Sequence, residues 1–155
     1  MPEHPAKTTL RLREFLPYRL SVLSNTVSGK IADLYDREFG LSVWQWRVMA
    51  VLGENAGITA TEIGRVTAMD KVAVSRAVSG LIDSGHVSRK ASPADGRRSI
   101  LSLTARGKAV YDKIVPIALS AERDLIATLN PAEQQQLARL MEKLARTSEP
   151  DRPLW

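Results

Sequence analysis

A guanidinium, an ammonium group and two hydroxyls fall between positions 71 and 79 on what reads as one face of a helix. Apolar residues recur at positions 74, 77, 78 and 81, which is the spacing of a buried helix face. Arg76 can grip a guanine edge or hold a phosphate, and Val72 can meet a thymine methyl. The alternative is an ordinary solvated helix face. The residues expected to face outward are Lys71, Val72, Ser75, Arg76 and Ser79.

A second group of charged residues, Asp95 to Arg98, surrounds Gly96, which permits a tight turn. Arginine is attracted into a narrow minor groove by the focused negative potential there, and we expect Arg97 to be the inserted residue. Asp95 would repel DNA, so we expect it to orient an arginine through a charge-assisted pair. The residues expected to contact only the sugar-phosphate backbone are Arg89, Lys90 and Arg106.

Two short capped helices and a hairpin would position these residues. Thr59 and Glu62 have the spacing of a capping box, and Asp70 caps a second helix that ends before Gly85. The segments HVSRKA and SILSL read as two strands around the turn SPADGRR. Two helices separated by about four residues and followed directly by a hairpin form a winged helix-turn-helix.

Amphipathic helices precede this unit. Apolar residues spaced by three and four predict one long helix over 17–39. Ser42 and Gln45 have capping-box spacing and begin a second helix, which Gly53 and Gly57 are expected to end. Residues 1–14 are expected to form a loose arm.

Two further helices follow the hairpin. One begins at Thr104, with a kink expected at Pro116. The next begins at Asn130, whose side chain caps a helix with proline in its first turn. Residues 147–155 are expected to form a tail. The apolar residues expected to make the buried side of the last helix are Leu137, Leu140, Met141 and Leu144.

The positive charge is concentrated in the middle of the chain. The 155 residues have a net charge of +5 and a hydrophobic content of 44%, which is ordinary for one globular domain. Residues 59–108 contain nine Lys/Arg and four Asp/Glu, whereas the flanking segments nearly balance, with seven and six before and six and seven after. A polyanion-binding module between neutral helices would show this distribution, although a soluble basic patch would show it too.

The composition also argues against several classes of protein. The chain has no cysteine, which removes disulfides, thiol redox sensing and cysteine zinc sites. Its two histidines, His4 and His86, offer little to a metal site or to acid–base catalysis, so we expect no metal, no cofactor and no enzyme activity. No apolar run is long enough for a membrane span and no signal peptide is apparent, so a cytoplasmic location is expected.

The run DKVAVSRAVSGLIDSGHVSRKASPADGRRSILSLTARG resembles the MarR family of bacterial regulators. It is similar in the recognition helix, in the Leu-x-x-x-Gly exit from Leu81 to Gly85, in the Asp-and-Arg wing, and in the Leu-Thr-x-x-Gly motif that ends at Gly107. The resemblance covers roughly residues 17–146. It implies one mainly helical domain, in which a winged helix-turn-helix lobe over 42–103 is joined to dimerisation helices over 17–39 and 104–146.

The resemblance also implies partners. A homodimer would place its two lobes on a palindromic double-stranded DNA operator. Relatives of this kind are usually repressors released by a ligand, often an aromatic acid, and without cysteine or a histidine cluster a small organic effector remains, such as an aromatic acid or its coenzyme A thioester. Terminal helices with apolar faces around a basic centre agree with a dimer, because those faces need a partner.

The resemblance places the effector between the dimerisation helices and the lobe. An aromatic wall with one or two arginines suits an aromatic carboxylate. Trp44 and Trp46 can instead be core or interface anchors, and Arg47 can instead pair with Asp33 or Glu38. The residues that fall where such a crevice would be are Tyr18, Arg19, Ser28, Trp44, Trp46 and Arg47.

One other class of function stays open at this point. A winged helix can also act as a protein-interaction or assembly module that uses the same surface on a protein partner. Binding to DNA that weakens steeply with salt would distinguish the two, because phosphate contacts release counterions.

Overall fold

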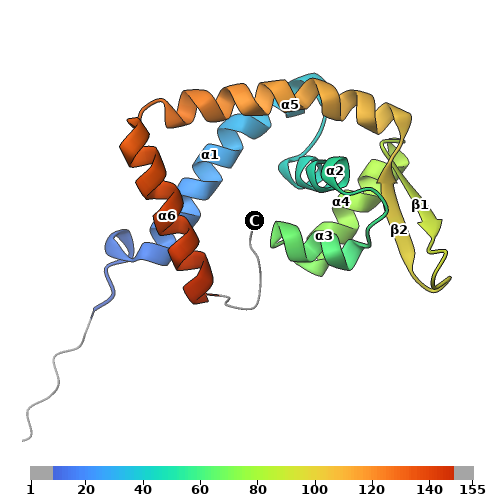
Figure 1. Ribbon diagram of the computed structural model, residues 1–155, viewed down its shortest axis with the longest axis horizontal. Coiled ribbons are helices and arrows are strands. Elements are labelled where there is room, and N and C mark those ends of the chain that lie inside the picture. The colour runs from blue at the N-terminus through green and yellow to red at the C-terminus, as the bar shows by residue number, and fades with distance from the viewer. Residues whose placement is uncertain (1–8, 149–155) are drawn as a thin grey trace, which may run out of the picture.

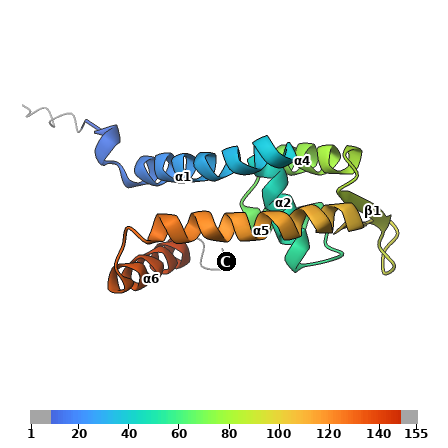
Figure 2. The ribbon, with the colours of Figure 1, turned by 90° about the horizontal axis from the view of Figure 1, so that it is seen from above.

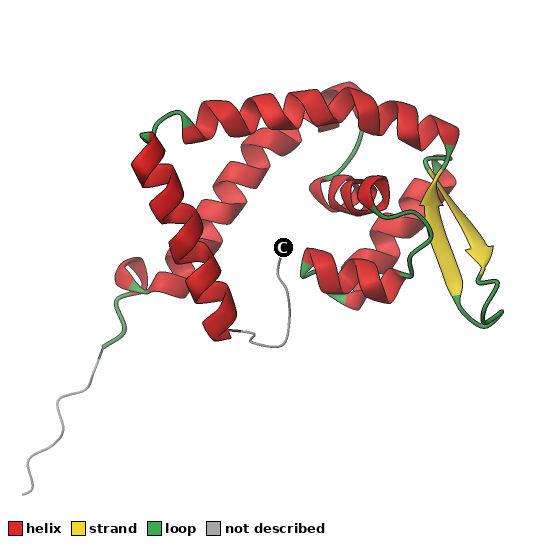
Figure 3. Ribbon diagram, viewed as in Figure 1, coloured by secondary structure: helices red, strands yellow, loops and turns green. Residues whose placement is uncertain are grey.

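The computed structural model describes residues 9–148 and is mainly helical, with one two-stranded sheet (Figures 1 and 3). The antiparallel strands place Val87 opposite Leu103 and Ala91 opposite Ser99. This is the predicted winged helix-turn-helix with additional terminal helices. In chain order the elements are η1 (Leu12–Glu14), α1 (Leu16–Phe39), α2 (Val43–Glu54), α3 (Ala60–Thr67), α4 (Lys71–Asp83), β1 (Val87–Ala91), β2 (Ser99–Leu103), α5 (Ala105–Ile126) and α6 (Pro131–Ser148).

The lobe formed by α2, α3, α4 and the hairpin hangs from the N-terminal half of α5 (Figure 1). The C-terminal end of α1 enters the lobe, while its N-terminal end extends away from it. Figure 2 separates α1 from α6, which lie on either side of α5 in that view. No helix within residues 9–148 is both long enough and apolar enough to cross a membrane.

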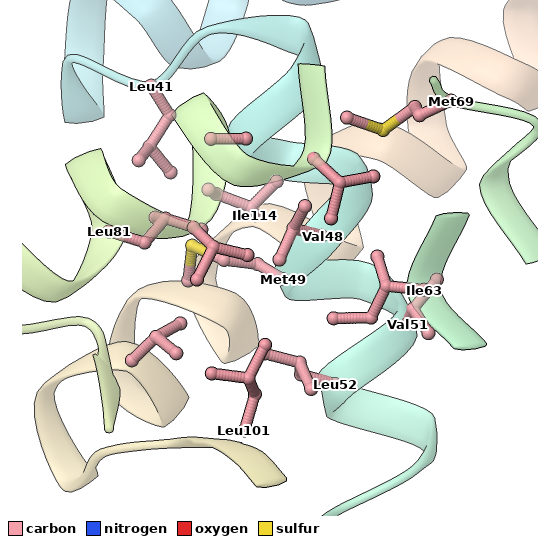
Figure 4. Packing of buried hydrophobic residues seen from close by; sticks show 14 of the residues in the cluster. Leu41, Val48, Met49, Val51, Leu52, Ile63, Met69, Leu81, Leu101 and Ile114 are labelled. Carbon is pink, nitrogen blue, oxygen red and sulfur yellow. The ribbon is translucent and has the colours of Figure 1, made fainter. Parts of the chain in front are cut away.

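The core of the lobe is built around α2, which buries an almost continuous apolar run against its neighbours (Figure 4). Leu81 from α4, Leu101 from β2 and Ile114 from α5 are each at most 1% exposed. Truncating a leucine or isoleucine in such a position typically costs about 2–5 kcal/mol of stability. The buried side chains of α2 are Val48, Met49, Val51 and Leu52.

Three elements meet at a junction formed by Gly85, His86 and Thr104. Gly85 has a φ of 75°, the left-handed conformation that glycine adopts without strain at the end of a helix. The Thr104 hydroxyl donates to the Gly85 carbonyl at 2.6 Å, and the Thr104 backbone N–H donates to the His86 carbonyl at 3.0 Å. The end of α4, the start of β1 and the start of α5 are therefore fixed to one another.

Gly107 allows the first turn of α5 to lie directly on this junction. Its backbone N–H donates to Thr104 Oγ1 at 3.0 Å, which caps the helix. A Cβ atom on Gly107 would lie 1.9 Å from the carbonyl oxygen of His86. The Leu-Thr-x-x-Gly motif thus combines a helix cap with a contact so close that it excludes any side chain.

The long helices keep much of their apolar surface exposed. On α1, Leu20 and Leu23 are 47% and 60% exposed. The predicted buried side of the last helix is wrong for the single chain, because α6 buries none of its residues. Its apolar residues, all between 44% and 49% exposed, are Leu137, Leu140, Met141 and Leu144.

Most predicted helix boundaries are confirmed, with three differences. Gly53 does not end α2, which continues to Glu54. The C-cap residue is Asn55, whose backbone N–H donates to the Val51 carbonyl. Pro116 lies inside α5, and the kink expected there stays a prediction. Of the predicted arms, residues 1–8 and 149–155 lie outside the described residues; within the rest, residues 12–14 form η1 and α6 extends to Ser148.

Replacing Gly107 with alanine should lower the free energy of unfolding by about 3 kcal/mol, because the His86 backbone must move to admit the new methyl group. Denaturation with urea measures this. Gly29→Ala is the matched control: Gly29 lies within α1 with no atom within 4 Å of its added Cβ, so alanine should raise stability by up to about 1 kcal/mol. Equal effects of the two substitutions would contradict the packing argument.

Candidate nucleic-acid interface

The helix-turn-helix consists of α3 and α4, and each helix begins with the predicted side-chain cap. Thr59 Oγ1 accepts from the Glu62 N–H at 3.3 Å, and the Glu62 carboxylate accepts from the Thr59 N–H at 2.7 Å. Asp70 Oδ1 accepts from the Ala73 N–H at 2.8 Å. Between the helices, Ala68 has a φ of 53°, a left-handed conformation that costs a non-glycine residue about 1 kcal/mol. The turn that orients α4 is therefore tightly specified.

The side chains of α4 divide between core and solvent as the sequence predicts. Val74 and Leu81 are 2% and 0% exposed, whereas Val72 is 59% exposed. We call the exposed side of this helix the reading face. It consists of the five predicted residues, all of which are exposed: Lys71, Val72, Ser75, Arg76 and Ser79.

Two grooves run along the flanks of α4. The first has a volume of about 360 Å³ and separates α4 from α3 and the hairpin; Lys71, Ser75 and Arg89 line it together with apolar residues. The second has a volume of about 490 Å³ and separates α4 from the N-terminal turn of α2. Arg76 and Trp44 line this second groove. The reading face therefore lies between two recessed strips.

The wing tip is a turn closed by backbone hydrogen bonds. The Arg98 N–H donates to the Asp95 carbonyl at 2.9 Å, and the Ser92 N–H donates to the Arg98 carbonyl at 2.8 Å. Asp95 Oδ1 accepts from the backbone N–H of Arg97 at 3.0 Å. Within residues 9–148 no ion pair joins Asp95 to an arginine side chain, so the expected pairing is wrong in this structure; its carboxylate instead holds the turn. The Arg97 residue is exposed.

Arg98 faces the start of α3, unlike its neighbour in the wing. It lines a recess of about 380 Å³ with Thr59, Glu62 and Arg65. The pKa of Glu62 lies below its usual range, first because the Thr59 backbone and hydroxyl donate to it and then because Arg65 and Arg98 lie nearby. Arg98 thus adds an electrostatic attraction between the wing and the helix-turn-helix.

The three residues predicted to contact only the sugar-phosphate backbone of DNA lie in different places. Arg89 faces the groove beside α4, and Lys90 is the next residue of β1, so it belongs to the opposite face of the hairpin. Arg106 lies at the base of the hairpin, where its charge adds to burial in lowering the pKa of His86. Arg89 is therefore the one of the three that lies beside the reading face.

Trp46 is the centre of an aromatic column that joins α1, α2 and α5. Its ring centroid lies 5.6 Å from that of Tyr35 and 5.9 Å from that of Tyr111. Burial raises the pKa of the Tyr35 hydroxyl, an effect that Arg47 opposes. The Tyr111 ring lies against the backbone of α2, where a Cβ on Gly53 would approach it to 2.4 Å. The absence of a side chain at position 53 therefore admits Tyr111 to the column.

Trp44 lies on a different side of α2 from this column. It is 45% exposed, and the Arg47 guanidinium carbon lies 5.1 Å from the centroid of its ring. No ion pair joins Arg47 to Asp33 or to Glu38, both of which the structure describes. The alternative pairing of Arg47 with a carboxylate is therefore wrong in this structure.

The six predicted effector residues do not form one site within a chain. Tyr18 and Arg19 lie near the N-terminal end of α1, about 25 Å along the helix from Tyr35 at a rise of about 1.5 Å per residue. Ser28, half-buried, lies between the two ends. Of the predicted set, only Trp44, Trp46 and Arg47 belong to the lobe, and Trp44 lies on a different side of α2 from Trp46.

Comparison with known proteins supports a single family. The model of the MarR family matches residues 39–98, from the end of α1 to the wing tip. The HTH-type transcriptional repressor Rv2887 of Mycobacterium tuberculosis is 29% identical over 131 residues, covering 84% of this chain and 91% of that protein. A solved structure of a probable transcriptional regulator from Pseudomonas aeruginosa is 30% identical, with a TM-score of 0.73 and coverage of 86% of this chain and 99% of that one. The chain belongs to the MarR family.

Membership in the MarR family makes the chain a DNA-binding transcription regulator, and the relatives it matches are regulators rather than enzymes. The same fold occurs in Bordetella bronchiseptica BpsR, at 22% identity with a TM-score of 0.78 and coverage of 88% of this chain and 97% of that one. The DNA binding of BpsR is regulated by 6-hydroxynicotinic acid.

Sequence reasoning missed Tyr35 and Tyr111 of this MarR-family chain. Tyr35 follows Ile31 by four residues and so continues its helix face, but as an aromatic residue with a hydroxyl it is not marked as part of the apolar pattern. Tyr111 gives no local signal, because its partner Trp46 is distant in the sequence. Gly53, near the end of α2, was the available signal, since a glycine within a helix lowers its stability relative to alanine and can have a packing reason.

The pH dependence of stability should report the environment of His86. Its side chain is buried with Nδ1 2.6 Å from Ser84 Oγ, and burial, helped by Arg106, lowers the pKa of the imidazole. The unfolded chain therefore binds a proton more readily below about pH 6.5, and stability should fall as the pH decreases from there. His86→Gln should flatten this slope in thermal melts between about pH 7.5 and 5.5. An unchanged slope in the variant would assign the effect to another group.

Proposed function

We propose that this regulator is a dimeric repressor that reads DNA with α4 and the wing and releases it when a small organic effector binds. The observation that carries the proposal is the reading face, a set of exposed polar and cationic residues on a capped helix beside an arginine-tipped hairpin. This unit lies in the segment that supplies the whole net charge of the chain. Such a combination fits the groove and phosphates of duplex DNA.

In this proposal the reading face enters the major groove. Arg76 grips a guanine edge or a phosphate, and Val72 contacts a thymine methyl. Ser75 and Ser79 bond to bases or phosphates, and Lys71 neutralises the backbone. The exposed valine supports base contact, because an apolar side chain that is 59% exposed contributes little to the lobe itself.

The wing supplies the second contact. Arg97 enters the minor groove, while Asp95 shapes the turn through the Arg97 N–H. Arg98 and Arg89 contact phosphates near the reading face, Arg98 from the side of α3 and Arg89 from the groove next to α4.

A second copy of the chain covers the exposed apolar residues of the long helices. We assign dimerisation to residues 17–39 and 104–146 and DNA binding to the lobe over 42–103. The exposed leucines of α1 and α6 support this division, because large apolar faces exposed to solvent usually mark protein–protein interfaces. The two reading faces would then lie about 34 Å apart on a palindromic operator.

The effector is proposed to be an aromatic acid or its coenzyme A thioester, bound beside the aromatic column. Trp46 offers a ring between α1 and α5, and the charge of Arg47 is near enough to Tyr35 to oppose the rise that burial causes in the pKa of its hydroxyl. Tyr18 and Arg19 join such a site only if a second protomer brings them to it. The regulation of BpsR by 6-hydroxynicotinic acid, an aromatic acid, supports the chemical class.

Arg76→Ala and Arg97→Ala should each weaken binding to the operator by about 1–3 kcal/mol while leaving the dimer intact. An Arg76 that reads a base should also relax sequence preference at one position. The measurement is fluorescence anisotropy with a duplex selected by this protein from a random-sequence library, at several salt concentrations. Lys113→Ala, which removes one exposed charge outside the lobe, is the matched control. Unchanged DNA affinity in both arginine variants, or a DNA affinity that does not depend on salt concentration, would favour a protein-interaction module instead.

A panel of aromatic acids and their thioesters should include a ligand that changes tryptophan emission and releases DNA. A tenfold loss of DNA affinity requires about 1.4 kcal/mol of differential binding between the two states of the dimer. Trp46→Phe should reduce the change in emission, and Arg47→Ala should weaken the response to the ligand. If no ligand alters emission or affinity, or if Arg47→Ala responds as the parent does, the effector site lies elsewhere.

A further inference from the structure

We infer that Trp44 is a DNA contact, and that the groove between α2 and α4 receives the sugar-phosphate strand on the side of the reading helix away from the wing. The inference rests on the proposed role of α4 as the reading helix. It moves Trp44 from the predicted effector set to the DNA surface.

The first observation is the position of Trp44. It shares its groove with Val72 and Arg76 of the reading face, whereas Trp46, two residues later, packs between α1 and α5. Trp44 is 45% exposed, and of the two tryptophans of α2 it is Trp46 that packs against the core. Because this exposed ring lies next to the surface proposed to bind DNA, bound DNA would cover it.

The second observation is that α4 has two flanks and the wing covers only one. An α-helix is about 10–12 Å across with its side chains, and the major groove is about 12 Å wide, so phosphates lie close to both flanks of an inserted helix. Lys71 and Arg89 line the flank toward the hairpin. On the opposite flank the large donors are Arg76 and Trp44.

The side chain of Gln45, in the N-terminal turn of α2, packs against α4. A Cβ on Gly80 would lie 2.7 Å from Nε2 of Gln45, so the two helices meet where α4 has no side chain. The backbone N–H of Gln45 donates to Ser42 Oγ and the Gln45 side chain accepts from the Ser42 N–H, which fixes this turn. Trp44 is therefore carried on a rigid element rather than on a loop.

The chemistry of the groove suits a phosphate strand. The indole N–H of Trp44 is a donor with no acceptor function, and its ring can pack against deoxyribose. The guanidinium of Arg47 stacks over this ring and brings positive charge to the same side. Asp70 also lines the groove, but its carboxylate accepts from the Ala73 N–H at the positive end of α4, which offsets its charge.

The test combines Trp44 variants with altered DNA, using the duplex selected by this protein from a random-sequence library. Trp44→Ala should lower affinity about tenfold for every bound sequence, as expected for a lost contact to the backbone. Trp44→Phe, which keeps a ring and loses the donor, should lower it less. Neither variant should change the salt dependence, since a neutral donor releases no counterion, whereas Arg76→Ala should reduce it. Thermal melting and sedimentation confirm that fold and dimer persist.

Single phosphates are then replaced by neutral methylphosphonates along the strand. In the parent, one replacement on the side away from the wing should weaken binding, and the same replacement should add little in Trp44→Phe, because the two changes remove one interaction. Lys113→Ala, which changes an exposed side chain outside the lobe, is the control and should respond as the parent does. Independent losses in Trp44→Phe, or parental affinity in Trp44→Ala, would overturn the inference. Parental affinity in both Trp44→Ala and Arg76→Ala would instead overturn the proposed role of α4.

Discussion

The hydrogen bonds around Thr104 are the constraint on which the arrangement of the lobe depends. Thr104 binds the Gly85 carbonyl through its hydroxyl and the His86 carbonyl through its backbone N–H, and the same hydroxyl caps α5 by accepting from Gly107. One residue therefore sets the angle between the reading helix, the hairpin and the helix that leaves the lobe. Because Gly107 has no side chain, these elements meet at backbone distance and leave no room for a second arrangement.

Glycines also allow close contacts where other elements meet, there with side chains. Gly53 admits the Tyr111 ring to the surface of α2, and Gly80 admits Gln45 to the surface of α4. Each glycine lies inside a helix, where alanine would be favoured by about 1 kcal/mol on intrinsic propensity alone. The helical preference lost at these positions is offset by packing, so α2 is held between α4 and α5 with both of its tryptophans in defined places.

Local signals in the sequence were sufficient to predict the helix-turn-helix and the wing. The caps at Thr59 and Asp70 are formed by neighbours three residues away, so their chemistry is legible without the fold. Tertiary contacts could not be predicted from the sequence. They include the exposure of α6, the column around Trp46 and the separation of Trp44 from that column. Each of these depends on residues distant in the chain or on a second molecule. Asp95 was expected to pair with an arginine side chain. Its carboxylate instead accepts a hydrogen bond from the backbone N–H of Arg97 in the same turn.

The concentration of positive charge in the lobe affects how the molecule approaches DNA by diffusion as well as how it binds. Residues 59–108 hold nine basic and four acidic residues at one end of an elongated chain, and the helices at the other end are nearly neutral. Such a body has an electric dipole along its length, and the field of a polyanion exerts a torque on it before any contact is made. Approach is therefore biased toward lobe-first collisions, which raises the fraction of encounters that end in the correct orientation and makes the association rate sensitive to ionic strength.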